Sequence, residues 1–568
     1  MKNIEVAKLL REIGDILELK EIPFKPRAFH KAALTIESMS DDIEDYFKQD
    51  KLLDIPSVGK GISKLITEFF ETGSMKELKK LRKEVPIDLE SLNKVQGLGP
   101  KTIKLLYMKL KVKNLDDLKK AAKRGKIESI KGLGKKFQDN LIHEIDVVKS
   151  RPNRMLLGHA YPIADELKER LSQLKSVKQV EIAGSFRRGR ETVGDLDILT
   201  ISNNQKEVMD FFTSMKDVKK VLAKGSTRSS IRLDNGLDVD IRVVKGDAFG
   251  AALMYFTGSK MHNIQLRKIA LKKGLTLNEY GLAGLKDKKR IGARSEEVVY
   301  KKLGLKWIPP ELRENVGEIE LARRNKLPHL VELKDVKGDF QIQTNWSDGA
   351  HSIPEMVEKA ESLGWKHLTI TDHVGNIGVA NPLDRKRLLK QIKEIEKLNK
   401  SSSIKIFAGA EVDILKNGKL AMDKDVLKKL DVVLGSIHSA FKMSEKEMTN
   451  RVISAMENYP FHIFAHPTAR RINVREPVAL NMEKIADVCK ERNIFLEING
   501  QPGRMDLHAT HVRMAKQRKC HFSIGSDAHS KEELELVKYG VITARRGGLE
   551  KKDILNCWNL KKIEKSFN

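Results

Sequence analysis

Acidic residues that alternate with apolar ones in two strand-like segments are the side chains best suited to chemistry. In GDLDILTI, Asp195 and Asp197 share one face of a strand, and in LDVDIRVV the same alternation aligns Asp238 and Asp240. Carboxylates gathered at one strand edge repel one another unless cations lie between them, and hard oxygen ligands suit Mg²⁺ or Mn²⁺. The pattern therefore predicts a two-metal site for in-line phosphoryl transfer.

A glycine-containing basic loop lies just before the first acidic pair. In GSFRRG, the turn at Gly184 and Ser185 offers backbone donors, and Arg188 offers a guanidinium, for phosphate oxygens. An isolated Asp-x-Asp pair is usually a solvated turn, but here the loop precedes it and a second pair follows. The combination favours a site that binds a triphosphate.

A second group of candidate ligands lies in the C-terminal part of the chain. Eleven of the 15 histidines follow residue 328, and histidines or carboxylates end a series of short apolar segments. A barrel of parallel strands places its active site at such strand ends, and the recurrence favours a metal site over isolated core or surface histidines. The candidate ligands are Asp348, His373, Glu411, His438, His466, Asp527 and His529.

Three similar glycine turns between helical segments form an internal repeat in the N-terminal part. Each turn lets the backbone approach a phosphate, and the helix that follows points unpaired N–H groups at the anion. One such turn is equally well explained as a tight helix connection, but three copies followed by lysine favour DNA binding without base specificity. The residues concerned are Gly59, Lys60, Gly61, Gly97, Gly99, Lys101, Gly132, Gly134 and Lys135.

The spacing of apolar residues predicts the elements that position these groups. Helical spacing predicts an all-α N-terminal region, alternating strands and helices predict an α/β core, and short apolar strands between helices are typical of a (β/α) barrel. We divide the chain into a small helical domain at 1–90, a second helical region at 91–150, an α/β part at 151–235 and 236–245, a further part at 246–316, a linker at 317–338 and a barrel at 339–568.

Composition indicates a polyanionic partner. Lys and Arg number 106 against 78 Asp and Glu, and the resulting net charge of +28 at pH 7 is spread along the chain. No apolar run is long enough to span a bilayer, so we expect no membrane partner. The three cysteines form no Cys-x-x-Cys pair, which favours a reducing compartment. We therefore expect a monomeric cytoplasmic protein.

The GSFRRG and GDLDIL segments resemble those of the nucleotidyltransferase superfamily. The segment YFTGS at residues 255–259, with Asn263 and Arg267, resembles the family X DNA polymerases similar to polymerase β. The resemblance covers residues 1–316 and implies a palm at 151–245 and a nucleotide-selecting domain at 246–316. It implies that the catalytic metals are bound by Asp195, Asp197 and Asp240, and the triphosphate by Gly184, Ser185, Arg188 and Gly194.

The same resemblance assigns roles around the incoming nucleotide. Tyr255 and Phe256 would crowd the sugar 2′ position and disfavour ribonucleotides, and Gly258 belongs to the same nucleotide-binding segment. Asn263 would read the minor-groove edge of the incoming base, and Arg267 would support the templating strand. These roles imply deoxynucleoside triphosphates as substrates.

The glycine turns resemble helix-hairpin-helix motifs. Residues 20–70 resemble the small N-terminal domain of polymerase β, which holds a downstream 5′-phosphate and uses a lysine to excise a 5′-deoxyribose phosphate. Here Ser57 replaces the usual hairpin glycine, and Leu65 stands where the lysine would be. The resemblance therefore implies 5′-phosphate binding more firmly than a lysine-based lyase.

The C-terminal series SDG, TDH, GxE, SxH, HP and SDAH resembles the PHP phosphoesterases, over residues 339 to about 560. The resemblance implies divalent cations, Mn²⁺ or Zn²⁺, at the seven C-terminal candidates, 3′–5′ exonuclease activity, and a phosphate contact from Arg470. The family's opening strand carries His-x-His, whereas this chain has Gln341 and Gln343. Amide oxygens are poor ligands for these metals beside imidazole, so we expect a weakened metal position and nuclease.

We therefore expect a DNA polymerase that fills short gaps in base excision or end-processing repair, acting on gapped or primed DNA with a downstream 5′-phosphate. Two alternatives stay open. Another nucleotidyltransferase, acting on RNA ends or small molecules, is opposed by the three glycine turns and by Tyr255 and Phe256. A DNA-binding repair protein with lapsed catalysis is opposed by the intact acidic triad, but less strongly for the PHP half.

Overall fold

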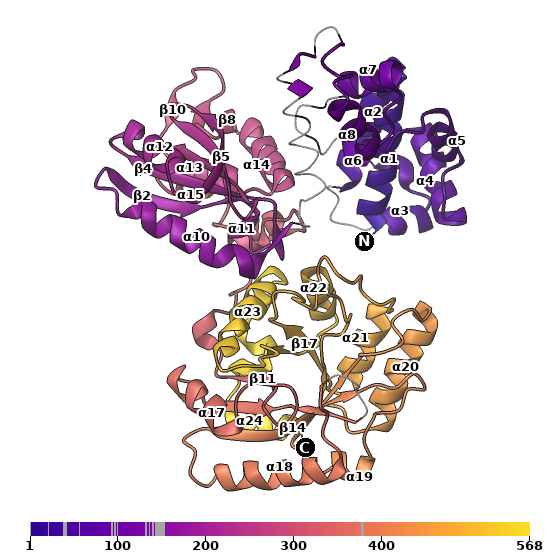
Figure 1. Ribbon diagram of the computed structural model, residues 1–568, viewed down its shortest axis with the longest axis vertical. Coiled ribbons are helices and arrows are strands. Elements are labelled where there is room, and N and C mark those ends of the chain that lie inside the picture. The colour runs from indigo at the N-terminus through magenta and orange to yellow at the C-terminus, as the bar shows by residue number, and fades with distance from the viewer. Residues whose placement is uncertain are drawn as a thin grey trace. The chain divides into compact units, whose positions relative to one another are not determined.

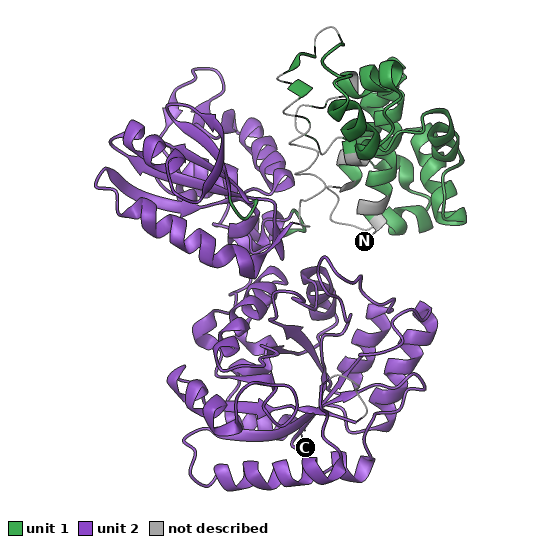
Figure 2. Cartoon of the chain, viewed as in Figure 1, with its two compact units in different colours: residues 1–153, 234–236, 315–317 green, residues 154–233, 237–314, 318–568 purple. Residues whose placement is uncertain are grey.

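The computed structural model of the chain describes residues 2–20, 22–37, 43–55, 57–92, 95, 98, 100–130, 133–135, 137–138, 141, 154–375 and 380–567. These residues fall into two compact units (Figure 2). The first unit comprises the described residues among 1–153, with 234–236 and 315–317. The second comprises 154–233, 237–314 and the described residues among 318–568.

The first unit is helical, which confirms the prediction from apolar spacing. In its longest helix, Val6, Leu10 and Ile13 recur at helical spacing and are fully buried. Asn114 caps a later helix by accepting a hydrogen bond from the N–H of Asp117. The helices are α1 (Lys2–Leu19), α2 (Lys25–Glu37), α3 (Ile43–Lys48), α4 (Lys60–Thr72), α5 (Lys76–Glu84), α6 (Leu89–Leu92), α7 (Pro100–Leu110) and α8 (Leu115–Lys123).

The second unit begins with a five-stranded sheet in the order β2-β4-β7-β6-β5. β4 and β7 run parallel and the other neighbours antiparallel. Within β4, Leu196 and Ile198 lie in the apolar core, so Asp195 and Asp197 lie on the opposite face. The strands are β2 (Val177–Ile182), β4 (Asp195–Ser202), β5 (Val218–Lys224), β6 (Arg228–Leu233) and β7 (Asp238–Val243), and the helices are α10 (Leu157–Ser172), α11 (Gly184–Arg187) and α12 (Gln205–Thr213); β1 (Met155–Leu156) pairs with β3 (Thr192–Val193).

Helices and a three-stranded antiparallel sheet follow, around a core that includes Met254, Leu266 and Tyr300. The guanidinium of buried Arg313 donates two hydrogen bonds to the carboxylate of Glu296, of 2.6 and 2.9 Å. The elements are α13 (Phe249–Thr257), α14 (Lys260–Lys272), β8 (Leu275–Asn278), β9 (Gly281–Gly284), β10 (Arg290–Ile291), α15 (Glu296–Lys302), the 3₁₀ turn η2 (Pro310–Leu312) and α16 (Glu318–Arg323).

The C-terminal part is a nearly closed barrel of parallel strands, as the sequence predicts. The strand order is β11-β12-β14-β15-β16-β17-β18, with β13 beside β14, and a parallel bridge between Ile342 and Ala528 brings the last strand back to the first. Strand residues are buried on both faces, because helices cover the outside of the barrel (Figure 1). The strands are β11 (Gly338–Ile342), β12 (His367–Ile370), β13 (His373–Val374), β14 (Lys405–Asp413), β15 (Val432–Ser436), β16 (Ile463–Phe464), β17 (Phe495–Asn499) and β18 (Phe522–Gly525).

The barrel helices pack over a continuous apolar core that runs from Val331 to Ile554. They are α17 (Ile353–Ser362), α18 (Arg385–Leu398), α19 (Lys424–Leu427), α20 (Glu445–Asn458), α21 (Met482–Glu491), α22 (Ala509–Gln517) and α23 (Val537–Arg546). The last helix, α24 (Leu560–Phe567), packs on a separate apolar cluster that includes Phe340 and Phe407. Among the described residues, none of the helices combines the length and the apolar character that crossing a membrane requires.

Candidate functional site

Two parallel neighbours in the five-stranded sheet, β4 and β7, align the acidic residues. Asp197 lies opposite Asp240, and Asp195 lies opposite Asp238. Burial, followed by the charges of Asp195 and Asp240, raises the pKa of Asp197 to about 7. The charges of the neighbouring carboxylates thus destabilise the ionised form of Asp197. Divalent cations would relieve this repulsion, and carboxylate oxygens are the hard donors that they prefer.

The neighbouring strand β6 distinguishes Asp240 from Asp238. Arg232 donates two hydrogen bonds to the Asp238 carboxylate, of 2.6 and 3.0 Å. Asp240 instead accepts a hydrogen bond from the hydroxyl of Ser230, and its Oδ2 lies 3.2 Å from Nη2 of Arg228. Asp238 is thus engaged in a bidentate ion pair, and Asp240 is oriented by groups that no sequence motif marks.

The basic loop lies directly against these carboxylates. Gly184 has a φ of +67°, and a Cβ there would come within 2.6 Å of Oδ2 of Asp197, so the close approach requires glycine. Arg188 donates to the carbonyl oxygen of Thr257, and its Nε lies 3.1 Å from Oε1 of Glu314. Burial lowers the pKa of Arg188. The loop therefore brings a half-buried guanidinium to the acidic edge.

Sequence reasoning missed Arg154. Its Nη2 lies 3.4 Å from the hydroxyl of Ser185 and donates to the carbonyl oxygen of Thr192, while a Cβ on Gly194 would lie 3.0 Å from its Nη1. Burial and the charge of Arg190 lower the pKa of Arg154. A guanidinium here suits a triphosphate, but Arg154 lies far before the motif in the sequence and follows no pattern.

Helices α13 and α14 carry the residues expected to select the nucleotide. Nδ2 of Asn263 donates to the carbonyl oxygen of Tyr255 at 2.6 Å, and its Oδ1 is buried without a hydrogen-bond partner among the described residues. The rings of Tyr255 and Phe256 meet edge to face with centroids 5.2 Å apart. Gly258 follows α13 with a φ of +70°, and Arg267 is exposed on α14. The structure therefore gathers four of these five residues near the α13–α14 junction.

In the first unit, α4 begins at Lys60 directly after Gly59. A Cβ at Gly59 or Gly61 would meet nothing within 4 Å, so the backbone of this turn is open. The turn lines a cavity of about 820 Å³ together with Lys25 and Leu65. An open helix N-terminus beside lysines suits an anion.

The other two glycine turns are described only in part. Gly97, Gly99 and Gly132 lie outside the described residues, and Lys101 lies in α7 with a side chain outside them. Gly134 is described, directly before Lys135, and a Cβ on it would meet nothing within 4 Å.

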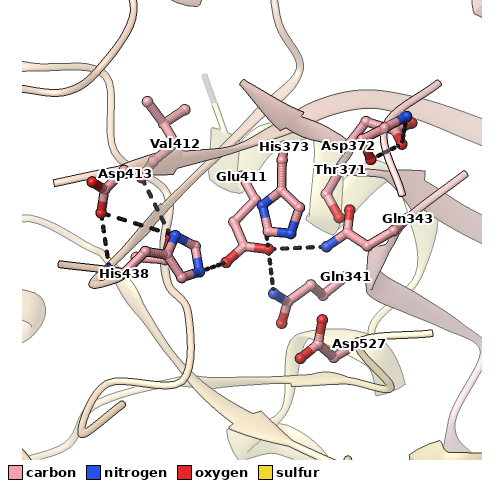
Figure 3. Close-up of polar contacts among 12 residues, drawn as sticks. Gln341, Gln343, Thr371, Asp372, His373, Glu411, Val412, Asp413, His438 and Asp527 are labelled. Carbon is pink, nitrogen blue, oxygen red and sulfur yellow. Dashed lines mark hydrogen bonds and ion pairs between the residues drawn. The ribbon is translucent and has the colours of Figure 1, made fainter. Parts of the chain in front are cut away.

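The barrel brings histidines and carboxylates together around the end of β14 (Figure 3). Asp348, His373 and His529 each place one ligand atom within 4.8 Å of the other two, and so do His373, Glu411 and His438. Imidazole and carboxylate donors of this kind suit Mn²⁺ or Zn²⁺. The residues present therefore fit cations on this side of the barrel mouth.

Glu411 is fully buried, and its carboxylate is contacted by two glutamine amides and by the imidazoles of three histidines, one of which, His373, lies 3.6 Å from Oε2. Its Oε2 accepts hydrogen bonds of 2.9 Å from the amides of Gln341 and Gln343, and its Oε1 lies 3.1 Å from Nε2 of His438 (Figure 3). The same Oε1 lies 2.9 Å from Nε2 of His466. Burial opposes ionisation of Glu411, but the surrounding imidazoles outweigh it and hold its pKa well below the usual range. The two glutamines thus donate to the carboxylate that a cation would otherwise bind.

A third amide extends this network to the far side of the barrel mouth. Nδ2 of Asn499 lies 3.1 Å from Oε1 of Gln341, 3.3 Å from Oε2 of Glu497 and 3.2 Å from Oδ2 of Asp527. Burial and the charge of Asp527 raise the pKa of Glu497 well above its usual value. Amide donors and a carboxyl group that favours its neutral form do not fit a further cation. Sequence reasoning missed Asn499 and Glu497, although both lie on strand β17.

Arg470, which is expected to contact a phosphate, is held by backbone carbonyl groups. Its guanidinium donates to the backbone carbonyl oxygens of Arg504 and Met505. Nε of Arg504, which the sequence analysis did not single out, lies 3.3 Å from Oδ2 of Asp527. Arg504 therefore contacts a candidate metal ligand of the barrel.

Comparisons with known proteins agree with this architecture. Family models match as DNA polymerase beta palm over residues 160–249, DNA polymerase beta thumb over 252–314, Helix-hairpin-helix domain over 1–75 and PHP domain over 339–501. A relative from Bacillus subtilis (strain 168), named DNA polymerase/3'-5' exonuclease PolX, is 37% identical over 568 residues, covering 99% of each chain.

More distant relatives share part of the chain. DNA polymerase lambda of Rattus norvegicus is 23% identical over 340 residues, which cover 55% of this chain and 56% of the relative. DNA polymerase lambda of Arabidopsis thaliana is 27% identical over 323 residues, which cover 50% of this chain and 57% of the relative.

Proposed function

Because the chain belongs to the bacterial family X DNA polymerases that carry a PHP domain, we propose that it extends primers on gapped DNA with deoxynucleoside triphosphates and trims 3′ ends weakly at a second site. Enzymes with these domains depend on divalent metals, and membership of the family argues against both alternatives left open by the sequence. We place this activity in short-gap repair by a cytosolic monomer. The three free cysteines suit such a reducing compartment.

The observation that carries the polymerase assignment is the alignment of Asp195, Asp197 and Asp240 on the neighbouring strands β4 and β7, beside the basic loop. These carboxylates would hold divalent cations, Mg²⁺ or Mn²⁺ in our proposal, which would supply activation of an attacking hydroxyl and stabilisation of charge on the transferring phosphoryl group. The raised pKa of Asp197 supports a site whose charge is balanced when cations bind. Ser230 and Arg228 orient the third carboxylate.

The chain's own donors bind and orient the nucleotide. Ser185 and Arg188, with Arg154 beside them, lie where phosphate oxygens would be held next to the acidic edge. The Tyr255 and Phe256 rings narrow the space for the sugar. Holding the triphosphate in line with the primer end is the larger part of catalysis in phosphoryl transfer, because the reaction needs positioning more than covalent help.

The cavity beside α4 supports binding of a downstream 5′-phosphate. Lys25 and Lys60 line it together with the open backbone of Gly59 and Gly61. Leu65, which is half-buried on the same helix, lines the cavity where a lyase would need an amine. We therefore propose 5′-phosphate binding without a lyase that depends on that position.

The PHP site is proposed as a weak 3′–5′ exonuclease that holds two cations, Mn²⁺ or Zn²⁺. The two ligand groups that share His373 support this number, and the amides of Gln341, Gln343 and Asn499 occupy the remaining space between carboxylates. We expect nuclease activity to be detected mainly with excess Mn²⁺ and to be lost in His438→Ala.

Primer extension on gapped DNA in Mg²⁺ and in Mn²⁺ tests the polymerase. Asp240→Asn should abolish nucleotide addition while DNA affinity stays nearly unchanged, because the loss is of transition-state stabilisation. Asp238→Asn is the matched control, since it lies on the same strand but pairs with Arg232 and keeps an acceptor for it. Near-normal extension by Asp240→Asn would contradict the assignment.

A further inference from the structure

The PHP part of the second unit packs directly against the loop that is expected to bind the triphosphate. Gly189 in this loop has a φ of +63°, and a Cβ there would lie 2.3 Å from Cγ2 of Ile542 and 3.6 Å from Cδ of Arg546, both on α23, the yellow helix labelled in Figure 1. An apolar cluster joins the same two parts, and its buried members are Leu157, Ala160, Val193, Met505 and Tyr539. The loop therefore has no room to shift toward the barrel.

Glu191, two residues further along the loop, is surrounded by basic side chains of the PHP part. Its Oε2 lies 2.9 Å from Nη1 of Arg546, and its Oε1 lies 2.9 Å from Nε2 of His508 and 3.8 Å from Nη2 of Arg470. Glu191 is 6% exposed and Arg546 is 3% exposed. Burial opposes ionisation of Glu191, but Arg546 and His508 outweigh it and hold its pKa well below the usual range. Removing one partner would leave a buried charge uncompensated.

Arg546 also lies near the carboxylate that engages Arg188. Nη2 of Arg546 is 3.8 Å from Oε1 of Glu314, and the same oxygen is 3.1 Å from Nε of Arg188 and 3.8 Å from Nη1 of Arg190. Three guanidinium groups therefore share one carboxylate oxygen. The more strongly Arg546 attracts Glu314, the less of the Arg188 charge is neutralised, and Arg188 is the group expected to meet the triphosphate.

A second contact links the PHP part to Arg154, whose side chain lies beside the loop. Nδ2 of Asn473, in the PHP part, donates to the backbone carbonyl oxygen of Arg154 at 3.0 Å. The side chain of Arg154 in turn contacts Ser185 and Thr192. Both arginines at the triphosphate site are thus placed through contacts with the PHP part.

We propose that Arg546, a residue of the PHP part, is a positioning residue for nucleotide binding at the polymerase site. It holds Glu191 and shares Glu314, which fixes the loop and leaves Arg188 able to bind phosphate. This inference rests on the polymerase function proposed above. It requires none of the barrel's metal ligands, so the PHP domain serves polymerisation even when its own nuclease is weak.

Steady-state extension kinetics of the full-length chain test the proposal. Arg546→Ala should raise KM for the nucleotide about tenfold or more, because a buried carboxylate loses its ion-pair partner and the loop is no longer held, while kcat changes by less than about threefold. Arg546→Lys should be intermediate, because one ammonium group cannot serve two carboxylates as a guanidinium does. Adding Glu314→Gln to Arg546→Ala should lower KM again by releasing Arg188, which a purely structural defect would not permit.

Arg545→Ala is the matched control. Arg545 is the neighbouring residue on α23, but it donates to Glu311 at 2.6 Å and to the carbonyl oxygen of Val331 at 2.9 Å, away from Glu191 and Glu314. Its loss should leave KM unchanged. Metal content of the barrel, measured in each variant, reports whether the PHP part is still folded.

Three results would overturn the inference: an unchanged KM in Arg546→Ala, an equal rise in Arg545→Ala, or no recovery with Glu314→Gln. If Arg546→Ala does not fold, the same comparison is made in Arg546→Lys with and without Glu314→Gln. A wild-type chain that does not extend primers would contradict the proposed function instead. In that case the nucleotide-induced shift in Tm, compared between wild type and Arg546→Lys, tests nucleotide binding separately.

Discussion

The surroundings of Glu411 illustrate how glutamine in place of histidine, at positions 341 and 343, changes what a site can bind. Oε2 of Glu411 accepts hydrogen bonds from two glutamine amides, and its Oε1 lies beside two imidazoles that could share it with a cation. The amide donors occupy lone pairs of Oε2 and leave this oxygen fewer for a metal. One oxygen of Glu411 still lies within 4.8 Å of a ligand atom of His373 and of His438, so the carboxylate stays in reach of a cation.

At this scale we predict that Gln341→His with Gln343→His raises the number of bound cations by one. Imidazole supplies the softer donors that Mn²⁺ and Zn²⁺ prefer, and it removes two hydrogen bonds to Glu411. The nuclease rate should rise by at least about 10- to 100-fold, the range seen when even an outer partner of a metal ligand is restored. Metal analysis of the purified protein and a single-strand degradation assay measure the two effects.

The control for this variant is Gln341→Asn with Gln343→Asn, which keeps amide chemistry and should bind no additional metal. Primer extension should be the same in all three proteins. A wild type that already binds as much metal and degrades single strands as fast as the histidine variant would show that amides are adequate ligands here.

Among the elements, the strands that carry the carboxylates were predictable because alternation in β4 and β7 is a local pattern. Asp238 and Asp240 satisfy that pattern equally, and they differ in the structure because Arg232 and Ser230 lie opposite them on β6. The barrel was predictable for a similar reason, since short buried strands between helices recur along the chain. Local spacing carries no information about a partner on a third strand.

Contacts between distant segments were not predictable. Glu191 pairs with Arg546, and Asn499 pairs with Gln341. The members of each pair are more than 150 residues apart in the sequence, and no motif marks either pair. The segment 317–338 was expected to be a linker, yet it includes α16, where buried Glu318 hydrogen-bonds Nδ1 of His262 at 2.7 Å. A segment dense in charged residues is typical of a solvent-exposed linker. Its sequence does not show that Glu318 is buried against His262, because that contact arises only from tertiary packing.

For α4 we predict that Leu65→Lys creates an amine that reacts with an abasic 5′ end. Leu65 lines the same cavity as Lys25 and Lys60, so a lysine there would face the sugar of a bound 5′-phosphate. The amine would condense with the open-chain sugar aldehyde, losing water to form an imine that borohydride reduces to a stable link. Borohydride trapping of protein on DNA should rise well above wild type, and should fall back in Leu65→Lys with Lys60→Ala if phosphate binding positions the sugar. Trapping by wild type at the level of Leu65→Lys would contradict this account of α4.

At the scale of the whole molecule, the first unit and the polymerase site contribute different kinds of contact. The helical unit presents open backbone at Gly59, Gly61 and Gly134 beside lysines, and we propose that such turns hold backbone phosphates without reading bases. The second unit holds both candidate catalytic sites, and α23 packs against β17 and β18 of the barrel while its last residue contacts the triphosphate loop. A net charge of +28 spread over the chain means that DNA affinity is set largely by the release of counterions.

This charge leads to the prediction that affinity for gapped DNA falls steeply with salt, and more so when the downstream strand bears a 5′-phosphate. Neutralising about 6 to 10 phosphates would cost roughly 10³- to 10⁵-fold in affinity between about 50 and 200 mM salt. Replacing Lys60, Lys101 and Lys135 by Ala removes one lysine from each glycine turn. Because each lysine is expected to contact about one phosphate, the slope of log Kd against log salt should fall by about three. Titrations with and without the 5′-phosphate measure this, and Lys206→Ala, on the exposed start of α12, is the single-charge control. If the triple variant keeps the wild-type slope, the glycine turns only connect helices and DNA is held elsewhere on the chain.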